Sequence, residues 1–370
     1  MYPALAVARS LSARPDAPEL AWLGGRRGLE AELVGAAGLP IDRLVLRSLR
    51  SVERDIHLVL DPLRLAASVP QAAVILARHR PAAVFTTGGY VAIPTVIAAR
   101  LLGIPVLLWE GNVTPGRSVR LIAPWVRAVA VSYEATCVAL STAGRPCFVT
   151  GTPIRDTRDV DREAARERLA IPPGARLLLV FGGSQAVRRL NRAVADALPR
   201  LVERVHVLHV TGHEGYAAAL AGREALPLDL RTRYRPHAFL RDEMLDALAA
   251  ADLLVGRAGS STLAEAAAFG LPMIVVPYPH AGGHQRANAR AFLEAGAARL
   301  VEDEAFDGAA LLRAAEILDD PQAHPRMSAA ARDLGRPAAA AAIADLLLAL
   351  AERRDLPTPD EIERRSRGRP

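Results

Sequence analysis

The chain has 370 residues, 51% of them hydrophobic and only 4% aromatic, so it is long enough for two domains with cores built mainly of Ala, Leu and Val. It contains no lysine, and arginine carries the net charge of +6, which suits phosphate or anionic-lipid partners. Cys137 and Cys147 alone exclude a cysteine metal site and argue against a disulfide framework, so we expect a reducing compartment. No signal peptide is recognisable and no apolar run approaches the ~20 residues of a membrane span, so we expect a soluble or peripheral protein.

In the first half of the chain, short apolar runs alternate with helix-length segments, which is typical of buried parallel strands joined by helices. The runs are residues 83–85, 106–108, 128–131 and 147–149. A glycine turn at residues 87–90 follows the first run, and residues 109–112 follow the second. Glu110 and Asn112 therefore lie where strand ends meet, and polar side chains there either cap loops or face a ligand.

A Pro- and Gly-containing stretch separates the two halves, and we place the domain boundary within residues 152–172. Arg155 either clamps a phosphate at this hinge or is an ordinary surface arginine. Asp159 and Asp161 have the DxD spacing of metal-dependent sugar transferases. Because they begin a predicted helix over residues 159–169, we interpret them as helix-capping residues.

The second half repeats this winding, with strands predicted at residues 177–180, 205–210, 234–237, 253–255, 273–276 and 298–301. The predicted fold class is α/β, with two Rossmann-like doubly wound domains facing a cleft at the carboxyl ends of their strands. The predicted parts are an N-terminal domain over residues 1–152, a C-terminal domain over 153–336, a closing helix over 337–351 and a charged tail over 352–370. We expect the tail to be mobile.

Two glycine turns of the second half are candidate phosphate sites. Gly182 and Gly183 follow the strongest strand, so the backbone can approach a pyrophosphate closely and the Ser184 hydroxyl can bind a phosphate oxygen. The alternative is an ordinary strand-to-helix turn. The position of the turn, directly after that strand, favours the phosphate site.

The other turn lies within residues 253–265, where an apolar strand runs into a helix that begins at Ser260 or Ser261. Free N–H groups and the positive dipole end of a helix suit phosphates. Glu265, one turn inside, can accept two hydrogen bonds from the vicinal hydroxyls of a ribose. The alternative is a helix capped by Ser261, and these residues alone leave both interpretations open.

Gln285 and Asn288 lie one turn apart at another predicted helix start. Their amide groups could bind sugar hydroxyls, and the alternative is a helix start exposed to solvent. Three histidines, His206, His209 and His213, follow one another closely. We interpret them as core or cleft-lining side chains, and we predict no metal and no cofactor.

Seven motifs occur in the order found in the MurG family of two-domain GT-B glycosyltransferases, which form lipid II in bacterial peptidoglycan synthesis. They lie at residues 22–24, 88–91, 110–112, 151–155, 182–185, 257–265 and 285–289. The chain resembles this family from Tyr2 to about residue 350. The resemblance implies transfer of GlcNAc from UDP-GlcNAc to the MurNAc C4 hydroxyl of undecaprenyl-linked lipid I, with inversion. It also implies a peripheral protein on the cytoplasmic face of the cell membrane, with an anionic membrane surface and no nucleic acid among its partners.

The same resemblance implies roles for individual residues. Asn112 and Gln285 would bind the GlcNAc hydroxyls, Leu240 would pack against uracil, and Glu265 would bind ribose. The diphosphate would be held by a further set, Arg155, Ser184, Ser260, Ser261 and Thr262, and the adjoining Leu263 and Ala264 complete the predicted substrate-binding residues. These groups could stabilise the departing UDP without a divalent ion.

The sequence departs from the family pattern in three places. Ala186 stands where the family usually has glycine, and Gly282 and Gly283 replace an acidic residue. The family's first strand and its glycine-rich loop would precede Met1, which falls one position after the loop's histidine, a residue often proposed as the base. We therefore expect unpaired strand edges in the first domain and an upstream in-frame sequence that encodes the missing strand. Without that loop, Glu110 is the candidate base.

Apolar residues interleaved with arginines predict either a membrane patch or an amphipathic helix that faces the core. They are Ile56, Leu58, Val59, Leu63, Leu65 and Val69, with Arg47, Arg50, Arg54 and Arg64. Two other functions remain open: a UDP-sugar 2-epimerase of similar fold, and an inactive fragment that only binds nucleotide sugars.

Overall fold

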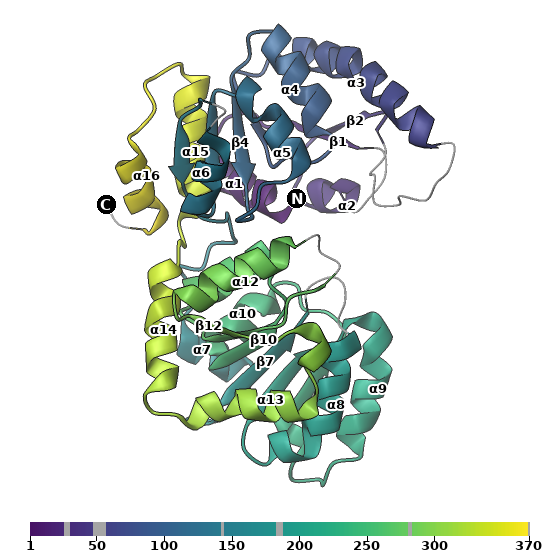
Figure 1. The fold of residues 1–370 in the computed structure, drawn as a ribbon, viewed down its shortest axis with the longest axis vertical. Helices are drawn as coiled ribbons and strands as arrows, with labels where there is room; N and C mark the ends of the chain where they lie inside the picture. Colours follow the sequence, from purple (N-terminus) through teal and green to yellow (C-terminus); the bar gives the residue numbers. More distant parts are fainter. Residues whose placement is uncertain (26–29, 47–56, 142–143, 183–187, 280–282, 369–370) are drawn as a thin grey trace. The chain divides into compact units, whose positions relative to one another are not determined.

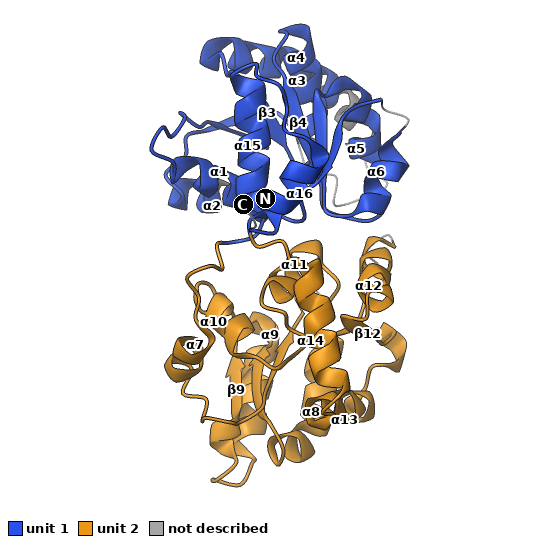
Figure 2. Ribbon diagram, turned by 90° about the vertical axis from the view of Figure 1, so that its left-hand side faces the viewer, with its two compact units in different colours: residues 1–155, 338–370 blue, residues 156–337 orange. Residues whose placement is uncertain are grey.

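The structure is a computed structural model that describes residues 1–25, 30–46, 57–141, 144–182, 188–279 and 283–368, with the backbone alone at 30–31 and 57–63. It forms two compact units, which Figure 2 shows in different colours. Unit 1 comprises residues 1–155 and 338–370, and unit 2 comprises residues 156–337. The chain passes from unit 1 to unit 2 after Arg155, within the stretch 152–172, and it returns to unit 1 at Ala338 for its last helices.

Unit 1 is built on a parallel four-stranded sheet in the order β3-β4-β5-β6, of which Figure 1 labels β4. The strands are β3 (Val84–Thr86), β4 (Val106–Glu110), β5 (Ala128–Val131) and β6 (Cys147–Val149). Side chains of β4 alternate between two cores: Val106 and Leu108 join one cluster, and Leu107 and Trp109 join the other. This two-residue alternation buries both faces of the sheet, as the apolar runs predict.

The sheet of unit 1 is interrupted beside β3. Strands β1 (Trp22–Gly25) and β2 (Ile41–Leu44) pair with each other in a separate two-stranded parallel sheet. Within the described ranges, β1 pairs only with β2 and β3 only with β4, and all three residues of β3 are half-buried. The expected unpaired strand edges are therefore present between β1 and β3.

Helices cover both faces of the unit 1 sheet. The helices that contribute to this unit are α1 (Tyr2–Ser12), α2 (Glu30–Ala36), α3 (His57–His79), α4 (Ala92–Leu101), α5 (Arg117–Ile122), η1 (Ala123–Trp125), α6 (Glu134–Leu140), α15 (Ala339–Ala351) and α16 (Pro359–Ser366). Residues of α3, α4 and α5 share a core with Val106, whereas residues of α1, α15 and α16 share a core with Leu107.

The prediction of a mobile tail is wrong, because α16 packs onto unit 1. Ile362 is fully buried in the core that contains Leu107. A capping box closes the start of the helix: Thr358 Oγ1 accepts from the Glu361 N–H, and the Glu361 carboxylate accepts from the Thr358 N–H. Leu356 packs against the same core, and Arg365 pairs with Asp345 of α15, so several contacts order this charged segment.

Unit 2 holds a six-stranded parallel sheet in the order β12-β11-β10-β7-β8-β9. The strands are β7 (Leu177–Phe181), β8 (His206–Val210), β9 (Tyr234–His237), β10 (Leu253–Gly256), β11 (Met273–Val275) and β12 (Ala298–Leu300). The chain winds outward from β7 to β9, then crosses back to β10 and winds the other way. The switch point therefore lies between the adjacent strands β7 and β10, which is where doubly wound sheets bind ligands.

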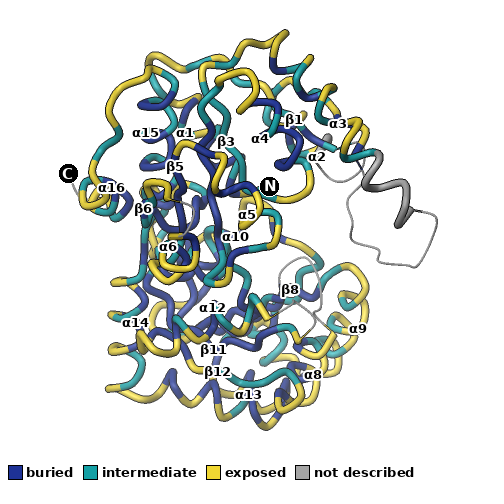
Figure 3. The backbone as a smooth tube through the Cα atoms, turned by 45° about the horizontal axis from the view of Figure 1, so that its top comes forward, coloured by how far each residue is buried: buried dark blue, intermediate teal, exposed yellow. Residues whose placement is uncertain are grey.

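The helices of unit 2 are α7 (Arg162–Arg168), α8 (Arg188–Val202), α9 (Gly212–Glu224), η3 (Arg231–Arg233), α10 (Glu243–Ala250), α11 (Ser260–Ala268), α12 (His284–Glu294), η4 (Asp303–Ala305), α13 (Gly308–Ala315), η5 (Glu316–Asp319) and α14 (Ala323–Leu334). Along α13, buried residues alternate with exposed ones (Figure 3), and its apolar face joins α8 and Val180 in one core. Asp161 caps α7 by accepting from the Ala164 N–H at 2.8 Å, which confirms the capping interpretation for Asp161, whereas Asp159 lies before the helix, which begins at Arg162.

Among the described helices, residues 323–351 are long and apolar enough by composition to cross a membrane, contrary to expectation. The segment is divided at residues 335–338 into α14 and α15. In α15, Ile343 and Leu346 are fully buried in a core of unit 1. The apolar character of α15 is thus explained by packing.

Cys137 and Cys147 form a disulfide, contrary to the prediction from the cysteine count. Helix α6 packs beside β6 and brings their Cα atoms to 5.8 Å, within the range that a disulfide spans. The sequence argument failed because it counted cysteines without the contact between these two elements.

Candidate nucleotide-sugar site

The turn between β10 and α11 leaves the start of the helix open. Gly259 is the N-cap residue, and no side chain caps the helix. The first described backbone hydrogen bond of the helix runs from the Leu263 N–H to the Gly259 carbonyl at 3.0 Å. Ser261 therefore does not cap the helix, and the N–H groups of Ser260, Ser261 and Thr262 face outward from the helix start, as a phosphate site requires.

Side chains of α11 divide between a ligand-facing side and the core. Ser260, Ser261, Thr262, Ala264 and Glu265 are half-buried, whereas Leu263 is 1% exposed. Leu263 can therefore contact a ligand only through its backbone. The other five side chains remain accessible at the carboxyl end of β10.

The backbones of β7 and β10 approach each other closely at the switch point. Gly256 pairs with Phe181, and a Cβ atom at position 256 would lie 2.5 Å from the Phe181 carbonyl oxygen. Glycine is thus required here for the two strand ends to lie side by side. Ser184 follows β7 but lies outside the described residues.

A salt bridge that the sequence analysis missed supports this turn. Arg257 Nη1 lies 2.5 Å from Asp303 Oδ1 and donates to the Val276 carbonyl at 3.1 Å. Its guanidinium also lies 5.5 Å from the ring centroid of Tyr278. Arg257 is 5% exposed, so it fixes the turn from within the unit instead of facing a ligand.

Gln285 connects to the same assembly. Its Oε1 accepts a hydrogen bond from the Tyr278 N–H at 2.9 Å, and the side chain is half-buried at the start of α12. Asn288, one turn further, is buried and donates to the Ala258 carbonyl at 3.4 Å. Gln285 is thus oriented beside the β10–α11 turn, and Asn288 tethers α12 to that turn.

Next to β7, a buried polar network joins α8, β8 and β9. Asn191 Nδ2 donates to the Thr211 carbonyl at 2.9 Å, which directs its Oδ1 toward His209 Nε2 at 3.0 Å. His209 Nδ1 lies 2.9 Å from the Tyr234 hydroxyl. His209 therefore carries its proton on Nε2 and accepts from Tyr234, and burial lowers its pKa to about 3.

These contacts explain the position of His209, one of the three neighbouring histidines. His206 lies on β8 and is only half-buried, and His213 lies in α9. In the described part of the chain, no three His, Cys, Asp or Glu side chains come together as metal ligands.

Leu240, after β9, is 7% exposed, whereas its neighbour Phe239 is 51% exposed. The Leu240 side chain is mostly covered by protein, so little of it can contact a base.

In unit 1, Glu110 organises the loop after β4. Its Oε1 accepts from both the backbone N–H and the side-chain Nδ2 of Asn112 at 2.9 Å, and its Oε2 accepts from the Gly116 N–H at 2.9 Å. Glu110 is 6% exposed. Both oxygens of the candidate base are thus engaged with the loop that carries Asn112.

Met1 occupies the position next to the one where the family pattern has its histidine. It is the N-cap residue of α1, without a side-chain cap, and its carbonyl accepts from the Leu5 N–H at 3.1 Å. Its side chain is half-buried and ends in a thioether, which is only a weak hydrogen-bond acceptor. Met1 therefore begins a helix, and its side chain does not supply a base.

Arg155 is the last residue of unit 1's first stretch and is half-buried. The turn after β3 contains a residue in the left-handed region, Gly88 with φ of 77°, which glycine adopts without strain. The Gly88 N–H donates to Thr86 Oγ1 at 3.3 Å. Of the predicted apolar patch with arginines, Leu65 packs against a core of unit 1, and most other members lie outside the described side chains.

Two doubly wound units, with glycine turns at strand ends and an open helix start at a switch point, are features of the two-domain GT-B fold, and the family matches assign the chain to the glycosyltransferases of this fold. Residues 1–131 match the glycosyltransferase family 28 N-terminal domain, and residues 177–345 match the family 28 C-terminal domain. Curated relatives share substantial identity over almost the whole chain. The protein from Moorella thermoacetica is 37% identical over 363 residues, covering 95% of this chain and 96% of the relative.

The relative from Frankia casuarinae is 39% identical over 354 residues, covering 93% of this chain and 91% of the relative. Both relatives are named UDP-N-acetylglucosamine–N-acetylmuramyl-(pentapeptide) pyrophosphoryl-undecaprenol N-acetylglucosamine transferase. The crystal structure of Acinetobacter baumannii MurG matches with a TM-score of 0.73 at 27% identity and covers 94% of this chain and 95% of that one. This chain belongs to the MurG family of glycosyltransferases.

A UDP-N-acetylglucosamine 2-epimerase from Listeria monocytogenes also matches, with a TM-score of 0.68 at 15% identity over 95% of this chain and 93% of that one. At that identity the likeness extends only to the fold. The GT-B fold expected from the sequence is confirmed by the family and structural matches together.

Proposed function

We propose that this enzyme transfers GlcNAc from UDP-GlcNAc to the C4 hydroxyl of the MurNAc residue of undecaprenyl-linked lipid I, with inversion, and so forms lipid II. The names of the relatives specify this donor and this class of acceptor. The single observation that supports donor binding most strongly is the uncapped start of α11 at the switch point of unit 2.

Residues of unit 2 would bind the donor in sequence from base to sugar. The backbone of Leu240, whose side chain is covered, would contact uracil, and Glu265 would accept hydrogen bonds from the ribose hydroxyls. The N–H groups of Ser260, Ser261 and Thr262 would bind the diphosphate together with Ser184. The Gln285 amide, oriented by the Tyr278 N–H, would bind a GlcNAc hydroxyl.

The family pattern assigns further substrate contacts to residues of unit 1. Asn112 is held by Glu110 and would bind a second GlcNAc hydroxyl, and Arg155 would add positive charge near the diphosphate. As the bond to GlcNAc breaks, negative charge grows on the UDP oxygens. Preorganised N–H donors and an arginine stabilise that charge because they need no reorganisation during the reaction.

The proton of the acceptor hydroxyl must also be removed. Glu110 is our candidate base, but its three hydrogen bonds to the loop favour a role in positioning Asn112. The two roles make different kinetic predictions, which are given in the Discussion. We also propose that the protein acts peripherally at the cytoplasmic face of an anionic membrane, where an undecaprenyl-linked acceptor would lie.

The test is UDP release from UDP-GlcNAc with and without a short-chain lipid I analogue, with the sugar products analysed in parallel. Release that requires the acceptor, together with a disaccharide product, is the expected result. Formation of the 2-epimer of the sugar without acceptor would indicate an epimerase and overturn the proposal. Binding of UDP-GlcNAc with no product of either kind would indicate a module that only binds nucleotide sugars.

A further inference from the structure

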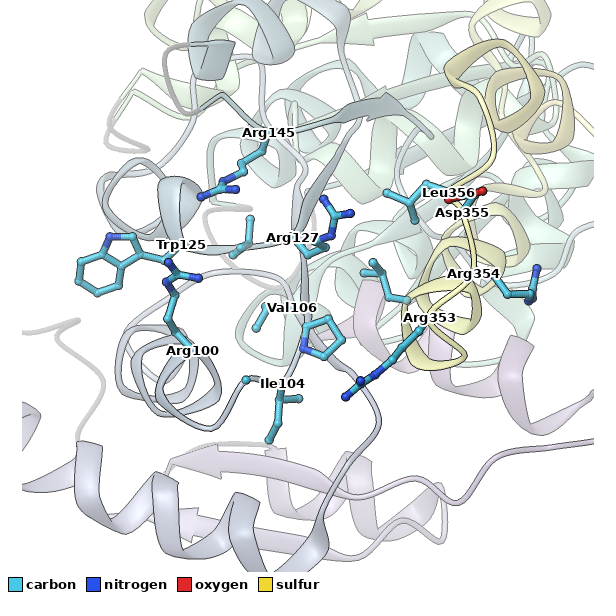
Figure 4. A pocket seen from close by; sticks show the side chains of 14 residues that line it. Arg100, Ile104, Val106, Trp125, Arg127, Arg145, Arg353, Arg354, Asp355 and Leu356 are labelled. Carbon is cyan, nitrogen blue, oxygen red and sulfur yellow. The ribbon is translucent and has the colours of Figure 1, made fainter.

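A cavity of about 400 Å³ lies in unit 1 at the amino ends of β4 and β5 (Figure 4). Val106 and Val126, each 2% exposed, and Leu350, 5% exposed, form part of its lining. Val106 begins β4 and Glu110 ends it. At ~3.3 Å per residue, the cavity is about 13 Å along the strand from the Glu110 loop. The cavity is therefore separate from the unit 1 residues assigned to donor binding.

The lining of this cavity is strongly cationic. Of its 14 residues, five are arginines and one is acidic: Arg100, Arg127, Arg145, Arg353, Arg354 and Asp355. In the ranges that the structure describes, Arg100, Arg127 and Arg353 form no ion pair. Arginines that outnumber the acidic residues of one lining repel one another, and an anion placed among them relieves that repulsion.

Two further arginines differ in their arrangement. Arg145 donates to the Pro124 carbonyl from Nε at 3.1 Å and from Nη2 at 2.7 Å, which holds its guanidinium in place. Arg354 pairs with Glu352 and, in Figure 4, extends away from the other four arginines. Four exposed arginines thus line the cavity, and the fifth, whose side chain extends away, provides a natural comparison with the same charge.

The backbone at Arg353 is strained. Its φ of 55° lies in the left-handed region, where a non-glycine residue is disfavoured, and it follows the end of α15. Glycine or asparagine would fit this position better. Arg80 and Ala170, which follow α3 and α7, also have positive φ, so the left-handed turn at Arg353 is the way this helix ends, and it directs the chain along the cavity.

We propose that this arginine pocket, formed by Arg100, Arg127, Arg145 and Arg353 over Val106, Val126 and Leu350, binds a phosphate monoester or diester. Guanidinium groups bind phosphate oxygens in pairs, and the volume suits a small molecule or a lipid headgroup. Trp125, which is 41% exposed, and Leu356 add apolar surface at the rim for the remainder of the ligand.

Two of the four arginines, Arg100 and Arg127, lie within the matched family 28 N-terminal domain. Arg145 and Arg353 lie outside residues 1–131 and 177–345, which match the family 28 domains. The pocket plays no part in the proposed transfer, so its test does not depend on that proposal.

The first experiment is titration of the full chain with inorganic pyrophosphate by calorimetry at constant ionic strength, in the presence of excess UDP to occupy any diphosphate site in unit 2. We expect saturable binding that weakens at least tenfold in Arg127→Gln and in Arg353→Asn. Arg354→Gln, which removes the same charge beside the pocket, should change affinity less than twofold. Because asparagine tolerates φ of 55°, the Arg353→Asn protein should melt no lower than the unsubstituted protein.

The second experiment distinguishes the source of the phosphate. Co-sedimentation with phosphatidylglycerol vesicles that falls in the same two variants, and that pyrophosphate inhibits, would assign the pocket to a lipid headgroup. Vesicle binding that is unchanged in those variants, with pyrophosphate binding weakened, would assign it to a soluble phosphorylated ligand. The proposal is overturned if neither probe distinguishes Arg127→Gln from the unsubstituted protein, or if Arg354→Gln is equally impaired.

Discussion

The carboxylate of Glu110 accepts two hydrogen bonds from Asn112, one from its backbone N–H and one from its side-chain amide, both at 2.9 Å. Glu110 Oε1 thus holds the backbone of the loop and also sets the direction of the Asn112 side-chain amide. The side-chain donor of Asn112 is committed to Glu110, so the amide is oriented before any sugar arrives. A residue assigned to catalysis on sequence grounds therefore has a structural partner in the residue assigned to binding.

This pair predicts a non-additive mutant cycle. Asn112→Ala should lower kcat/KM for UDP-GlcNAc about tenfold, the effect of one lost hydrogen bond to the sugar. If Glu110 acts through Asn112, Glu110→Gln/Asn112→Ala should lie within about threefold of Asn112→Ala alone. Steady-state kinetics across a range of pH around neutrality supply the measurement. If Glu110 is the base, Glu110→Gln should instead lower kcat more than ~100-fold even when Asn112 is absent.

Glu265 predicts discrimination between UDP and 2′-deoxy-UDP. A carboxylate that accepts from the ribose hydroxyls loses a charge-assisted hydrogen bond when one hydroxyl is removed, which corresponds to about tenfold in affinity. Calorimetric titration should show this difference in the unsubstituted protein and not in Glu265→Gln. Equal discrimination by both proteins would remove Glu265 from the ribose site.

Gly256 predicts a stability loss caused by backbone proximity. Gly256→Ala would place a Cβ atom 2.5 Å from the Phe181 carbonyl oxygen, and the strands must separate at a cost of about 1–3 kcal/mol. The matched control is Gly222→Ala in α9, where the new Cβ atom would lie 3.6 Å from Leu198 Cδ2. Urea denaturation should show Gly222→Ala unchanged or more stable. Equal stability of the two variants would show that β7 and β10 are not held together by this contact.

His209 predicts a loss of stability in acid. Burial lowers its pKa from about 6.5 to about 3, so between these values the unfolded chain binds a proton that the folded chain does not. Stability is therefore fully present above pH ~6.5 and falls as the pH drops, by about 2 kcal/mol from this residue at pH ~5. The difference in unfolding free energy between neutral pH and that acidic pH should be smaller by that amount in His209→Gln. An unchanged difference would mean that His209 titrates normally in the folded protein.

The interrupted sheet predicts a pattern of hydrogen exchange. The Val84 N–H bonds to the Pro105 carbonyl at 2.9 Å, and residues of a parallel strand alternate in direction, so Phe85 points its N–H away from β4. In exchange measured by NMR, the Phe85 amide should exchange at least about tenfold faster than that of Thr86. Strong protection of Phe85 would indicate that another segment pairs with this edge.

The sequence predicted the elements that bury a continuous apolar run, such as β7 and β10, because such runs in alternation with helices have few other solutions. It did not predict β1 and β2, whose residues are mixed in polarity and only partly buried. In the site, the spacing of Ser260 and Glu265 was informative because helix geometry is local. Arg257 was missed because its partners Asp303 and Tyr278 come from distant segments, and no spacing in the sequence signals such a contact.

Unit 2 is one uninterrupted stretch, whereas unit 1 is assembled from the stretches on either side of it. During synthesis, residues 156–337 leave the ribosome before α15 exists, so the second unit in the sequence can finish folding first. Until α15 arrives, Leu107 and Trp109 lack the apolar partners Ile343 and Leu346 on their face of the sheet. The nascent first half therefore keeps this apolar face uncovered until a segment that is translated after the whole of unit 2 has packed onto it.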